Sequence, residues 1–308
     1  MQLEARKYSR NPILIPRVEE KSFEKACVYN PAAIVKDGKV FLLYRAEEGY
    51  YDGYISRVGL AISEDGFRFT RYAGNPIIDI DQKEEKRGIE DLRVVKIEND
   101  YFLTYTAYAG STGGTATGVT RIKLCGAFSR DLIHWEKLGP LIEGREKAGA
   151  IVQDYQYKDE YVMYFGEGIV RIAFSKDLRI WRVEKTPVLT PRQGYFDDIL
   201  VEGGPPPIVT KDGIVMIYNS AKGGMGYRGE KESLSYSPGV AIFDSENPRK
   251  LIFRSDKPLL EPTEYWEKYG KINNVIFTNG LVNFRGKWLL YYGGADKSIG
   301  VAELTIDF

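Results

Sequence analysis

The chain has 308 residues, and its 43 lysines and arginines balance 43 aspartates and glutamates, so the formal net charge is zero. A balanced surface argues against nucleic acid or an acidic membrane as the partner. His134 is the only histidine, which excludes a serine–histidine–aspartate triad elsewhere in the chain and any metal site with several histidines. Proton chemistry in this protein should therefore come mainly from carboxylates.

The two cysteines, Cys27 and Cys125, are far apart, and neither has a second cysteine or a histidine at metal-binding spacing. We expect both to be buried apolar side chains, and we expect no metal and no organic cofactor. Residues 1–7 lack the apolar core of a signal peptide, and no run of the sequence is long enough to span a membrane. These features predict a soluble, cytoplasmic protein.

Short runs rich in Tyr, Val, Ile and Phe alternate with Gly, Asp, Asn and Pro along the chain, which is typical of an all-β protein. Five of these runs resemble one another, and each follows a charged or glycine-containing turn. They are residues 40–45, 101–106, 161–165, 213–218 and 287–292. Their shared tyrosines are Tyr44, Tyr105, Tyr164, Tyr218 and Tyr291, which are 61, 59, 54 and 73 residues apart.

Five units of this size suit four-stranded blades, so the repeats predict a five-bladed β-propeller. We expect residues 1–308 to form a single domain, because blades close on one another and cannot be divided into independent halves. The alternative is a two-sheet sandwich whose strands resemble one another by accident.

Three segments that follow the repeated runs end in Ser-x-Asp-x-x-x-aromatic, starting at Ser63, Ser129 and Ser175. The aspartate should order a turn, and the aromatic side chain should pack between sheets. His134 lies inside the second of these motifs, so we expect its role to be structural.

Several polar residues stand where a propeller would bring them to its central axis. Glu90 and Asp91 are adjacent, at a point where a glycine-containing loop meets a strand-like run. Glu202 lies between an apolar run and a Gly/Pro loop, and Asp296 follows small residues that let a ligand approach the backbone. The full set of candidates is Asn30, Arg45, Glu90, Asp91, Glu202, Glu267 and Asp296.

Two of these candidates have plain structural alternatives. Asn30 could cap a turn, and Arg45 could form an ion pair without touching a ligand. Carboxylates combined with an arginine, an asparagine and many tyrosines nevertheless suit a carbohydrate, which offers apolar faces to rings and hydroxyls to polar groups.

The chain resembles glycoside hydrolase family 130, the β-mannoside phosphorylases and β-mannosidases, over essentially its whole length. The resemblance rests on residues 30–33, 44–46, 88–93, 201–207 and 292–296. The Glu-Asp-x-Arg segment is the most specific of these, and its usual proline is Leu92 here.

The resemblance implies a five-bladed propeller that cleaves β-mannosides with inversion. It implies that Asp91 is the general acid and protonates the leaving oxygen through a hydroxyl of the bound mannose. It also implies that Asn30, Arg45 and Asp296 hold that mannose. We include Glu90 and Arg93, from the same segment as Asp91, among the substrate-binding residues.

The second reactant separates the branches of the family. Phosphorylases of the family need cations for inorganic phosphate, and one family lysine appears as Glu202 here. A carboxylate has the wrong charge for phosphate, whereas an inverting hydrolase needs a basic carboxylate to activate water. We therefore predict Glu202 as the general base and Glu267 as a second acid that positions the water.

The sequence thus predicts an inverting exo-β-mannosidase, with β-1,2-linked manno-oligosaccharides as the substrates that the resemblance favours. The alternatives are a β-mannoside phosphorylase that releases α-mannose 1-phosphate and a non-catalytic sugar-binding propeller. Five-bladed enzymes that act on arabinosides or fructosides lack the Glu-Asp-x-Arg context. The glycine-rich segment 221–234 either shapes the leaving-group side or is an ordinary surface loop.

Overall fold

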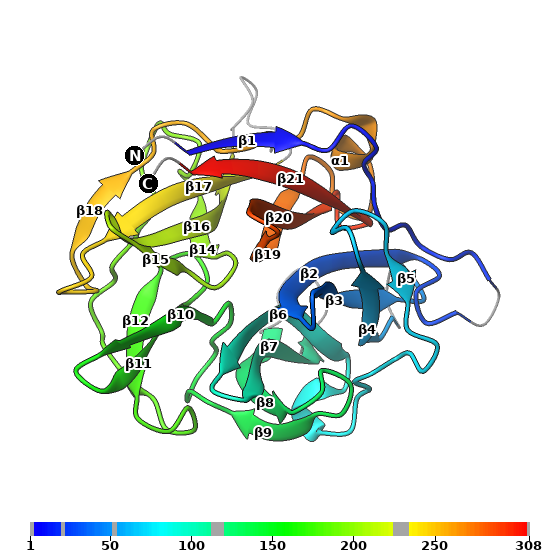
Figure 1. Ribbon diagram of the computed structural model, residues 1–308, viewed down its shortest axis with the longest axis horizontal. Helices are drawn as coiled ribbons and strands as arrows, with labels where there is room; N and C mark the ends of the chain where they lie inside the picture. Colours follow the sequence, from blue (N-terminus) through cyan, green and yellow to red (C-terminus); the bar gives the residue numbers. More distant parts are fainter. Residues whose placement is uncertain (1–2, 20–21, 51–53, 112–119, 224–233, 307–308) are drawn as a thin grey trace.

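The computed structural model describes residues 3–19, 22–50, 54–111, 120–223 and 234–306. These residues form β-strands with very little helix, so the all-β prediction is confirmed (Figure 1). The helical elements in the described ranges are a 3₁₀ turn, Lys83–Glu85, and the four-residue helix α1, Tyr265–Lys268. No helix among the described residues has the length and apolarity needed to cross a membrane.

The strands form five antiparallel units that follow one another along the chain. Units 1 and 2 belong to one sheet, because a parallel pairing of Ser56 with Gly88 joins them. Unit 1 contains β2 (Cys27–Lys36), β3 (Lys39–Glu47), β4 (Ser56–Ser63) and β5 (Thr70–Arg71), and unit 2 contains β6 (Gly88–Ile97), β7 (Asp100–Ser111), β8 (Thr120–Ser129) and β9 (Glu136–Pro140).

Units 3 to 5 are separate sheets. Unit 3 contains β10 (Ala150–Tyr157), β11 (Glu160–Phe165), β12 (Arg171–Ser175) and β13 (Arg182–Val183). Unit 4 contains β14 (Leu200–Gly203), β15 (Ile208–Thr210), β16 (Gly213–Lys222), β17 (Ser235–Phe243) and β18 (Leu251–Arg254), and unit 5 contains β19 (Ile276–Phe284), β20 (Lys287–Gly294), β21 (Ser298–Ile306) and β1 (Leu3–Lys7).

The units are arranged around a common centre (Figure 1). Strand β19 contacts β2, β2 contacts β6, and β6 contacts β10, so the first strands of successive units face one another. Each of the five repeated tyrosine runs lies in the strand that pairs with the first strand of its unit: β3, β7, β11, β16 and β20. The outer strand of unit 5 comes from the other end of the chain, because β1 pairs with β21 from Leu3–Ile306 to Lys7–Ala302.

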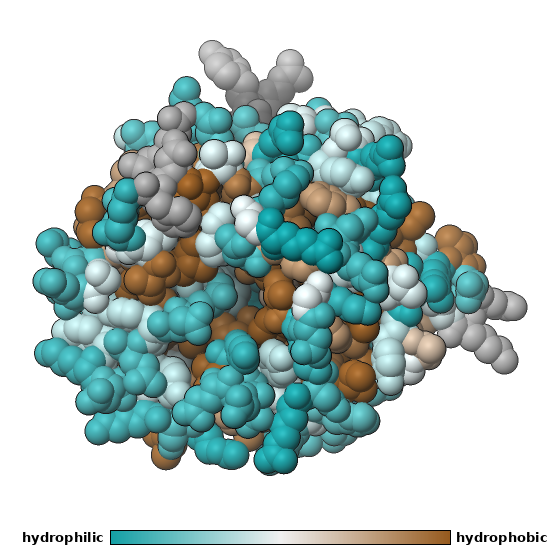
Figure 2. Space-filling model, in the orientation of Figure 1, coloured by the Kyte–Doolittle hydropathy of each residue, from teal (hydrophilic) through white to brown (hydrophobic). Residues whose placement is uncertain are grey.

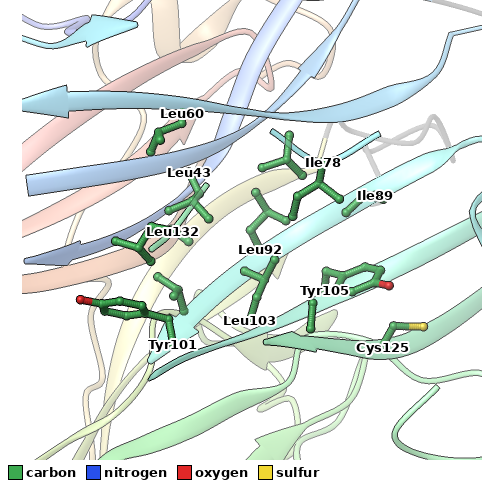
Figure 3. Close-up of a cluster of buried hydrophobic side chains, with 14 of the residues drawn as sticks. Leu43, Leu60, Ile78, Ile89, Leu92, Tyr101, Leu103, Tyr105, Cys125 and Leu132 are labelled. Atoms are coloured by element: carbon green, nitrogen blue, oxygen red, sulfur yellow. The ribbon is translucent and has the colours of Figure 1, made fainter. Parts of the chain in front are cut away.

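Apolar side chains fill the spaces between neighbouring units. Figure 3 shows the cluster between units 1 and 2, to which Leu43, Leu60, Leu92 and Leu103 contribute fully buried side chains. Leu92 is the residue that replaces the family proline, and here it packs into this core. Its role is therefore in packing rather than at the site. Cys27 and Cys125 are both buried free thiols, as expected.

The Ser-x-Asp motifs form the turns that their sequence predicts. In the first, Asp65 Oδ1 accepts hydrogen bonds from the amides of Phe67 and Arg68, at 2.8 and 2.7 Å. The motifs that start at Ser129 and Ser175 repeat this arrangement. His134 lies on the second turn, with an exposed side chain 2.7 Å from Asp131.

Three of the five repeated tyrosines donate a hydrogen bond to a buried carboxylate. The hydroxyls of Tyr44, Tyr105 and Tyr218 donate to the buried carboxylates of Glu24, Glu85 and Asp197, and each carboxylate also pairs with a cation: Arg71, Lys137 or Arg254. Tyr292 donates in the same way to Glu267, which pairs with Lys7. We call Glu24, Glu85, Asp197 and Glu267 the clamped acids. They connect distant segments inside or beside the units.

Candidate active site

A cavity of about 200 Å³ collects side chains from all five units. It brings together Asn30, Arg45, Glu90, Asp91, Glu202 and Asp296, which are six of the eight site residues predicted from the sequence. The other residues that line the cavity were not predicted from the sequence. They are Tyr29, Lys147, Glu167, Leu200, Tyr236, Ile272, Val275 and Phe277. Figure 2 shows one face of the molecule, with hydrophilic side chains around much of the rim and hydrophobic patches nearer the middle.

Larger surface depressions lie elsewhere. One of about 970 Å³ is lined by the outer turns around Asp131 and Asp177. Asp131 and Asp177 already accept backbone hydrogen bonds within their turns. The central cavity is smaller, but it is where carboxylates and cations from separate units converge, which is the usual signature of a functional site.

Backbone bulges aim two of the central residues. The pairing of β2 with β3 shifts register between Tyr29 and Ala32, and that of β6 with β7 shifts between Glu90 and Arg93. Asn30 and Asp91 lie in these bulges with positive φ angles of 44° and 52°. A bulge redirects a side chain, and Asn and Asp tolerate this left-handed conformation better than most residues. Both side chains thereby reach the cavity.

Two glycines position Glu202 at the cavity. Strand β14 carries Glu202 and ends at Gly203, where a Cβ atom would lie only 2.6 Å from the carbonyl oxygen of Ala148. At Gly204 a Cβ atom would lie 2.2 Å from the carbonyl oxygen of Ile217. Only glycine permits such close approach of two backbones. The Gly-Gly pair therefore brings Glu202 beside the segment that carries Lys147.

Arg45 organises one side of the cavity. Its Nη2 lies 2.7 Å from both Glu47 Oε1 and Glu90 Oε1, and its Nε donates to Ser56 Oγ at 2.9 Å. Burial raises the pKa of Glu90 to about 7, although Arg45 favours the charged form. Arg45 is thus both a structural ion pair and part of the cavity wall. Asn30 Oδ1 lies 3.5 Å from its Nη1.

Lys147 organises the opposite side. Its Nζ lies 3.3 Å from Asp91 Oδ2 and 3.1 Å from Glu202 Oε2, so one ammonium group contacts both of the carboxylates predicted to carry the reaction. Burial and the nearby Asp91 charge raise the pKa of Glu202. Burial also acts on Asp91, but Lys147, Arg93 and Arg45 outweigh it and lower the pKa of that carboxyl. In the free site, Asp91 is the more acidic of the two.

Asp296 lies in the turn between β20 and β21 and completes the wall. Burial raises the pKa of its carboxyl to about 6, in spite of Arg45 and Lys271. This value lies close to neutral pH, so a modest change in the surroundings of Asp296 would change its protonation state.

Arg93 does not line the cavity. Its guanidinium is buried and donates to the carbonyl oxygens of Asp91, Gly203 and Gly204. It therefore holds the backbones of Asp91 and of the segment after Glu202 in place. The prediction that Arg93 binds substrate does not fit this position, because the side chain is buried against backbone carbonyls and does not line the cavity.

Glu267 also lies away from the cavity. It is a clamped acid whose carboxylate pairs with Lys7, accepts from Tyr292 and accepts from the backbone amides of Thr263 and Glu264. It thus closes the capping box of helix α1. The predicted role in positioning water does not fit this placement.

Among the residues missed from the sequence, Lys147 and Glu167 contribute charge. Lys147 lies in the loop before β10 and Glu167 in the turn after β11, and 3.8 Å separate their charged groups. The glycines on either side of Glu167, both with positive φ, were the available sequence signal for a tight turn at the site. The predicted loop 221–234 falls largely outside the described residues, because 224–233 are not described.

The chain is similar to known proteins over nearly its whole length. A family model for glycoside hydrolase family 130, described as beta-1,4-mannooligosaccharide phosphorylase, matches residues 5–308. The 1,2-beta-oligomannan phosphorylase of Thermoanaerobacter sp. (strain X514) is 36% identical, over 99% of this chain and 98% of that protein.

Two solved structures are similar throughout. A glycosyl hydrolase from Bacteroides ovatus is 32% identical with a TM-score of 0.85, over 98% of this chain and 93% of its own. A second structure is 31% identical. It is described with the words that the GH130 family of mannoside phosphorylases contains glycoside hydrolases that target β-1,2 mannosidic linkages in Candida mannan. Its TM-score is also 0.85, over 97% of this chain and 93% of its own. The chain belongs to glycoside hydrolase family 130.

Proposed function

We propose that this protein is an inverting exo-β-mannosidase that hydrolyses β-1,2-linked manno-oligosaccharides. We also infer that units 1 to 5 are the blades of one propeller domain spanning residues 1–308, with the catalytic cavity at its axis. Support for the substrate comes from family membership and from relatives named for β-1,2-mannosides, among them both phosphorylases and hydrolases.

The observation that carries hydrolysis is the placement of Glu202. Its carboxylate is buried, lines the cavity and lies across Lys147 from Asp91. An inverting glycosidase needs one carboxyl to protonate the leaving group and a second to take a proton from water. A raised pKa makes Glu202 the stronger proton acceptor of the pair.

Asp91 must carry a proton before it can serve as the acid. In the free site Lys147 favours its ionised form. We propose that a bound mannose separates Asp91 from Lys147 and places a sugar hydroxyl against it. Loss of the neighbouring cation and further burial would then raise the pKa of Asp91. The acid delivers its proton through that hydroxyl to the leaving oxygen.

The charge of the cavity also favours water over phosphate. Five carboxylates line it, from Glu90, Asp91, Glu167, Glu202 and Asp296. The cations among its described lining residues, Arg45 and Lys147, are both paired with carboxylates. A phosphate dianion about 4 Å from an unpaired carboxylate would meet a repulsion of roughly 4 kcal/mol per pair of unit charges at an effective dielectric near 20. Water meets no such barrier.

Phosphorolysis is the second candidate, and two observations favour it. Lys147 supplies a cation beside Asp91 that the sequence had not revealed. The curated relative from Thermoanaerobacter is named a phosphorylase. In that reaction phosphate would replace water and release α-mannose 1-phosphate.

The deciding experiment incubates the protein with β-1,2-mannobiose, with and without inorganic phosphate, and separates mannose from mannose 1-phosphate. We expect mannose at the same rate in both, with the α anomer formed first as observed by NMR. Mannose 1-phosphate formed only when phosphate is present would overturn hydrolysis in favour of the second candidate. Binding without turnover that is insensitive to Asp91→Asn would favour a sugar-binding protein.

A further inference from the structure

We propose that a cationic groove beside the central cavity binds a phosphate monoester on the leaving group, so that the preferred substrates are phosphorylated β-mannosides. The inference rests on the proposed function and deepens it, because it names the class of leaving group. The cationic groove is a surface hollow of about 510 Å³, and its positive side chains are Lys83, Lys86, Arg121, Lys123 and Arg145.

Positive charge is concentrated in the cationic groove. Five of its lining residues are lysines or arginines, and Glu84 is the one acid among the described residues that line it. The whole chain, in contrast, has 43 basic and 43 acidic side chains. The groove is therefore positive in a protein without net charge, and a local excess of this kind attracts small anions.

Ion pairs leave most of this charge unneutralised. Lys83 Nζ lies 3.6 Å from Glu84 Oε1, and Arg145 Nη1 lies 2.6 Å from Glu167 Oε2. The other cations of the groove have no carboxylate partner in the described part of the chain, and they are Lys86, Arg121 and Lys123.

The cations reach the groove from three separate segments. Two precede β6, two lie near the start of β8, and one lies in the loop before β10. A phosphate monoester carries about −1.5 to −2 charges at pH 7 and has three acceptor oxygens, so it can contact several cations at once. A carboxylate has one charge and gains less from such a cluster. The groove therefore favours a phosphate monoester.

The cationic groove adjoins the central cavity. Arg145 lines the groove, and the carboxylate that it contacts belongs to Glu167, which lines the cavity. The segments that carry Lys86 and Arg145 continue directly into Glu90 and Lys147 of the cavity wall. A ligand that extends from the cavity over this part of the rim enters the groove.

The size of the cavity leaves the leaving group outside it. Its volume of about 200 Å³ is below the range of roughly 300–1,000 Å³ that is usual for pockets enclosing a drug-sized ligand. Under the proposed function the terminal mannose occupies the cavity, and the remainder of the oligosaccharide lies beyond the rim. Water still cleaves the glycosidic C–O bond, and the products are mannose and the phosphorylated remainder. The phosphate ester itself stays intact.

A second groove beside the cavity has a different character. It has a volume of about 600 Å³ and lies where units 5 and 1 meet. Its charged lining residues are Lys25, Lys297 and Glu48, and most of the others are proline, aliphatic or aromatic. Cations are therefore not spread evenly around the cavity, and the phosphate should bind on the side of units 2 and 3.

The test compares β-1,2-mannobiose with the same disaccharide carrying a 6-phosphate on its reducing-end unit. We expect kcat/KM to be at least about tenfold higher for the phosphorylated disaccharide, because several cations attract its phosphate. This ratio should shrink at high salt, which screens exposed charges. Equal kcat/KM values for the two disaccharides would overturn the proposal. An equal gain for mannobiose oxidised to a carboxylate at its reducing end would overturn the assignment to phosphate.

Lys86→Gln/Arg121→Gln locates the effect. It removes two exposed cations of the groove and should bring the ratio of the two kcat/KM values close to one. The matched control, Lys25→Gln/Lys176→Gln, removes two exposed cations elsewhere and should keep the wild-type ratio. A ratio that survives in the groove variant, or falls equally in the control, would overturn the assignment to the groove. Melting temperatures show that each variant is folded.

The proposed function and this inference can fail separately. If wild type cleaves neither disaccharide, the proposed function fails. Titration calorimetry with mannose 6-phosphate and with mannose needs no turnover and tests the groove alone. Tighter binding of mannose 6-phosphate that is lost in Lys86→Gln/Arg121→Gln and kept in the control supports the groove. Equal binding of the two sugars to wild type would overturn it.

Discussion

Buried carboxylates occupy two kinds of place in this protein, and their partners distinguish them. A clamped acid such as Glu85 accepts from a tyrosine hydroxyl and pairs with a cation, which satisfies its charge within the fold. The central acids Asp91 and Glu202 share a single ammonium group and face a cavity. Burial of an acid is therefore a poor guide to catalysis here. The better guide is whether its partners leave it open to a ligand.

The backbone shows part of this contrast, although Glu202 is not among the described residues with positive φ. Asp91 and Asp296 both adopt positive φ angles next to the cavity, at 52° and 50°. The clamped acids Glu24, Glu85, Asp197 and Glu267 do not appear among the described residues with positive φ. Strain of this kind persists where surrounding structure holds it and is concentrated at functional sites. Substitutions of the central acids should therefore change activity, whereas substitutions of the clamped acids should change stability.

The largest effect should come from the central pair. Asp91→Asn removes the proposed proton donor, and Glu202→Gln removes the proposed base, so each should lower kcat for β-1,2-mannobiose by about 10²–10⁴-fold. The thermal unfolding midpoint should stay near or above that of wild type, because each change removes a buried charge. A variant with near-normal kcat would remove that residue from the mechanism.

The clamped acids should show the opposite behaviour. Glu85→Gln leaves the buried ammonium of Lys137 without its inner carboxylate and should cost about 3 kcal/mol of unfolding free energy, with kcat retained. Glu267→Gln should behave alike, because Lys7 loses its partner. Urea unfolding and kcat, measured on the same samples, check both variants. A kcat loss in folded Glu267→Gln at normal stability would restore a catalytic role to Glu267.

A smaller effect should appear as pH-dependent stability at Asp296. Its folded pKa of about 6 lies above the ordinary value of 3.8, so the folded state binds this proton more tightly than the unfolded state. Stability from this group is present below about pH 4 and is lost as pH rises through 6. Asp296→Asn should therefore gain about 1–2 kcal/mol over wild type at pH 7, after discounting for its partial exposure, and nothing at pH 4.

The matched control for this measurement is Asp37→Asn. Asp37 is an exposed turn residue with a similar positive φ of 49°, so the substitution makes the same chemical and backbone change away from the cavity. Its unfolding free energy, measured by urea titration at pH 4 and pH 7, shows what the same chemical change does away from the cavity. A pH-independent gain in Asp296→Asn would contradict the raised pKa.

The smallest expected effect is a difference in unfolding free energy between substitutions of two of the repeated tyrosines. Tyr105 donates to the charged Glu85, whereas Tyr164 donates to the carbonyl oxygen of Pro248, both at 2.7 Å. Hydrogen bonds to charged groups contribute more than those to neutral ones. Tyr105→Phe should cost about 2 kcal/mol and Tyr164→Phe about 1 kcal/mol, measured by urea unfolding at pH 7. Equal costs would show that the clamped carboxylates add nothing to these contacts.

Much of the fold follows from local sequence. The tyrosine runs and the Ser-x-Asp turns depend on residues within a few positions of each other, so their strands and turns could be predicted. The joining of units 1 and 2 into one sheet could not, because it depends on a single pairing of Ser56 with Gly88 that no motif marks. The interruption between β14 and β15 is explained by the prolines that follow Gly204, since proline cannot donate to a neighbouring strand.

Site residues could be predicted where they belong to a distinctive sequence motif. They could not be predicted where their position depends on contacts between distant segments. Asp91 and Glu202 stand in distinctive segments and meet in the cavity. Lys147 lies in a loop without a motif, and only the close approach of Ala148 to Gly203 brings it between them. Arg93 shares a motif with Asp91 but points to backbone carbonyls instead, and sequence spacing alone could not distinguish these directions.

The pairing of β1 with β21 also sets the order in which this protein can be completed during its synthesis. Residues Leu3–Lys7 leave the ribosome roughly 300 residues before the strand they pair with, a contact of extreme sequence separation. Until β21 emerges, β1 has no partner strand in unit 5 that would hold Lys7 beside Glu267. Asn30 lies in unit 1, and Asp296 lies in unit 5, in the turn that precedes β21. The central cavity should therefore not be complete in the nascent chain until β21 has been made.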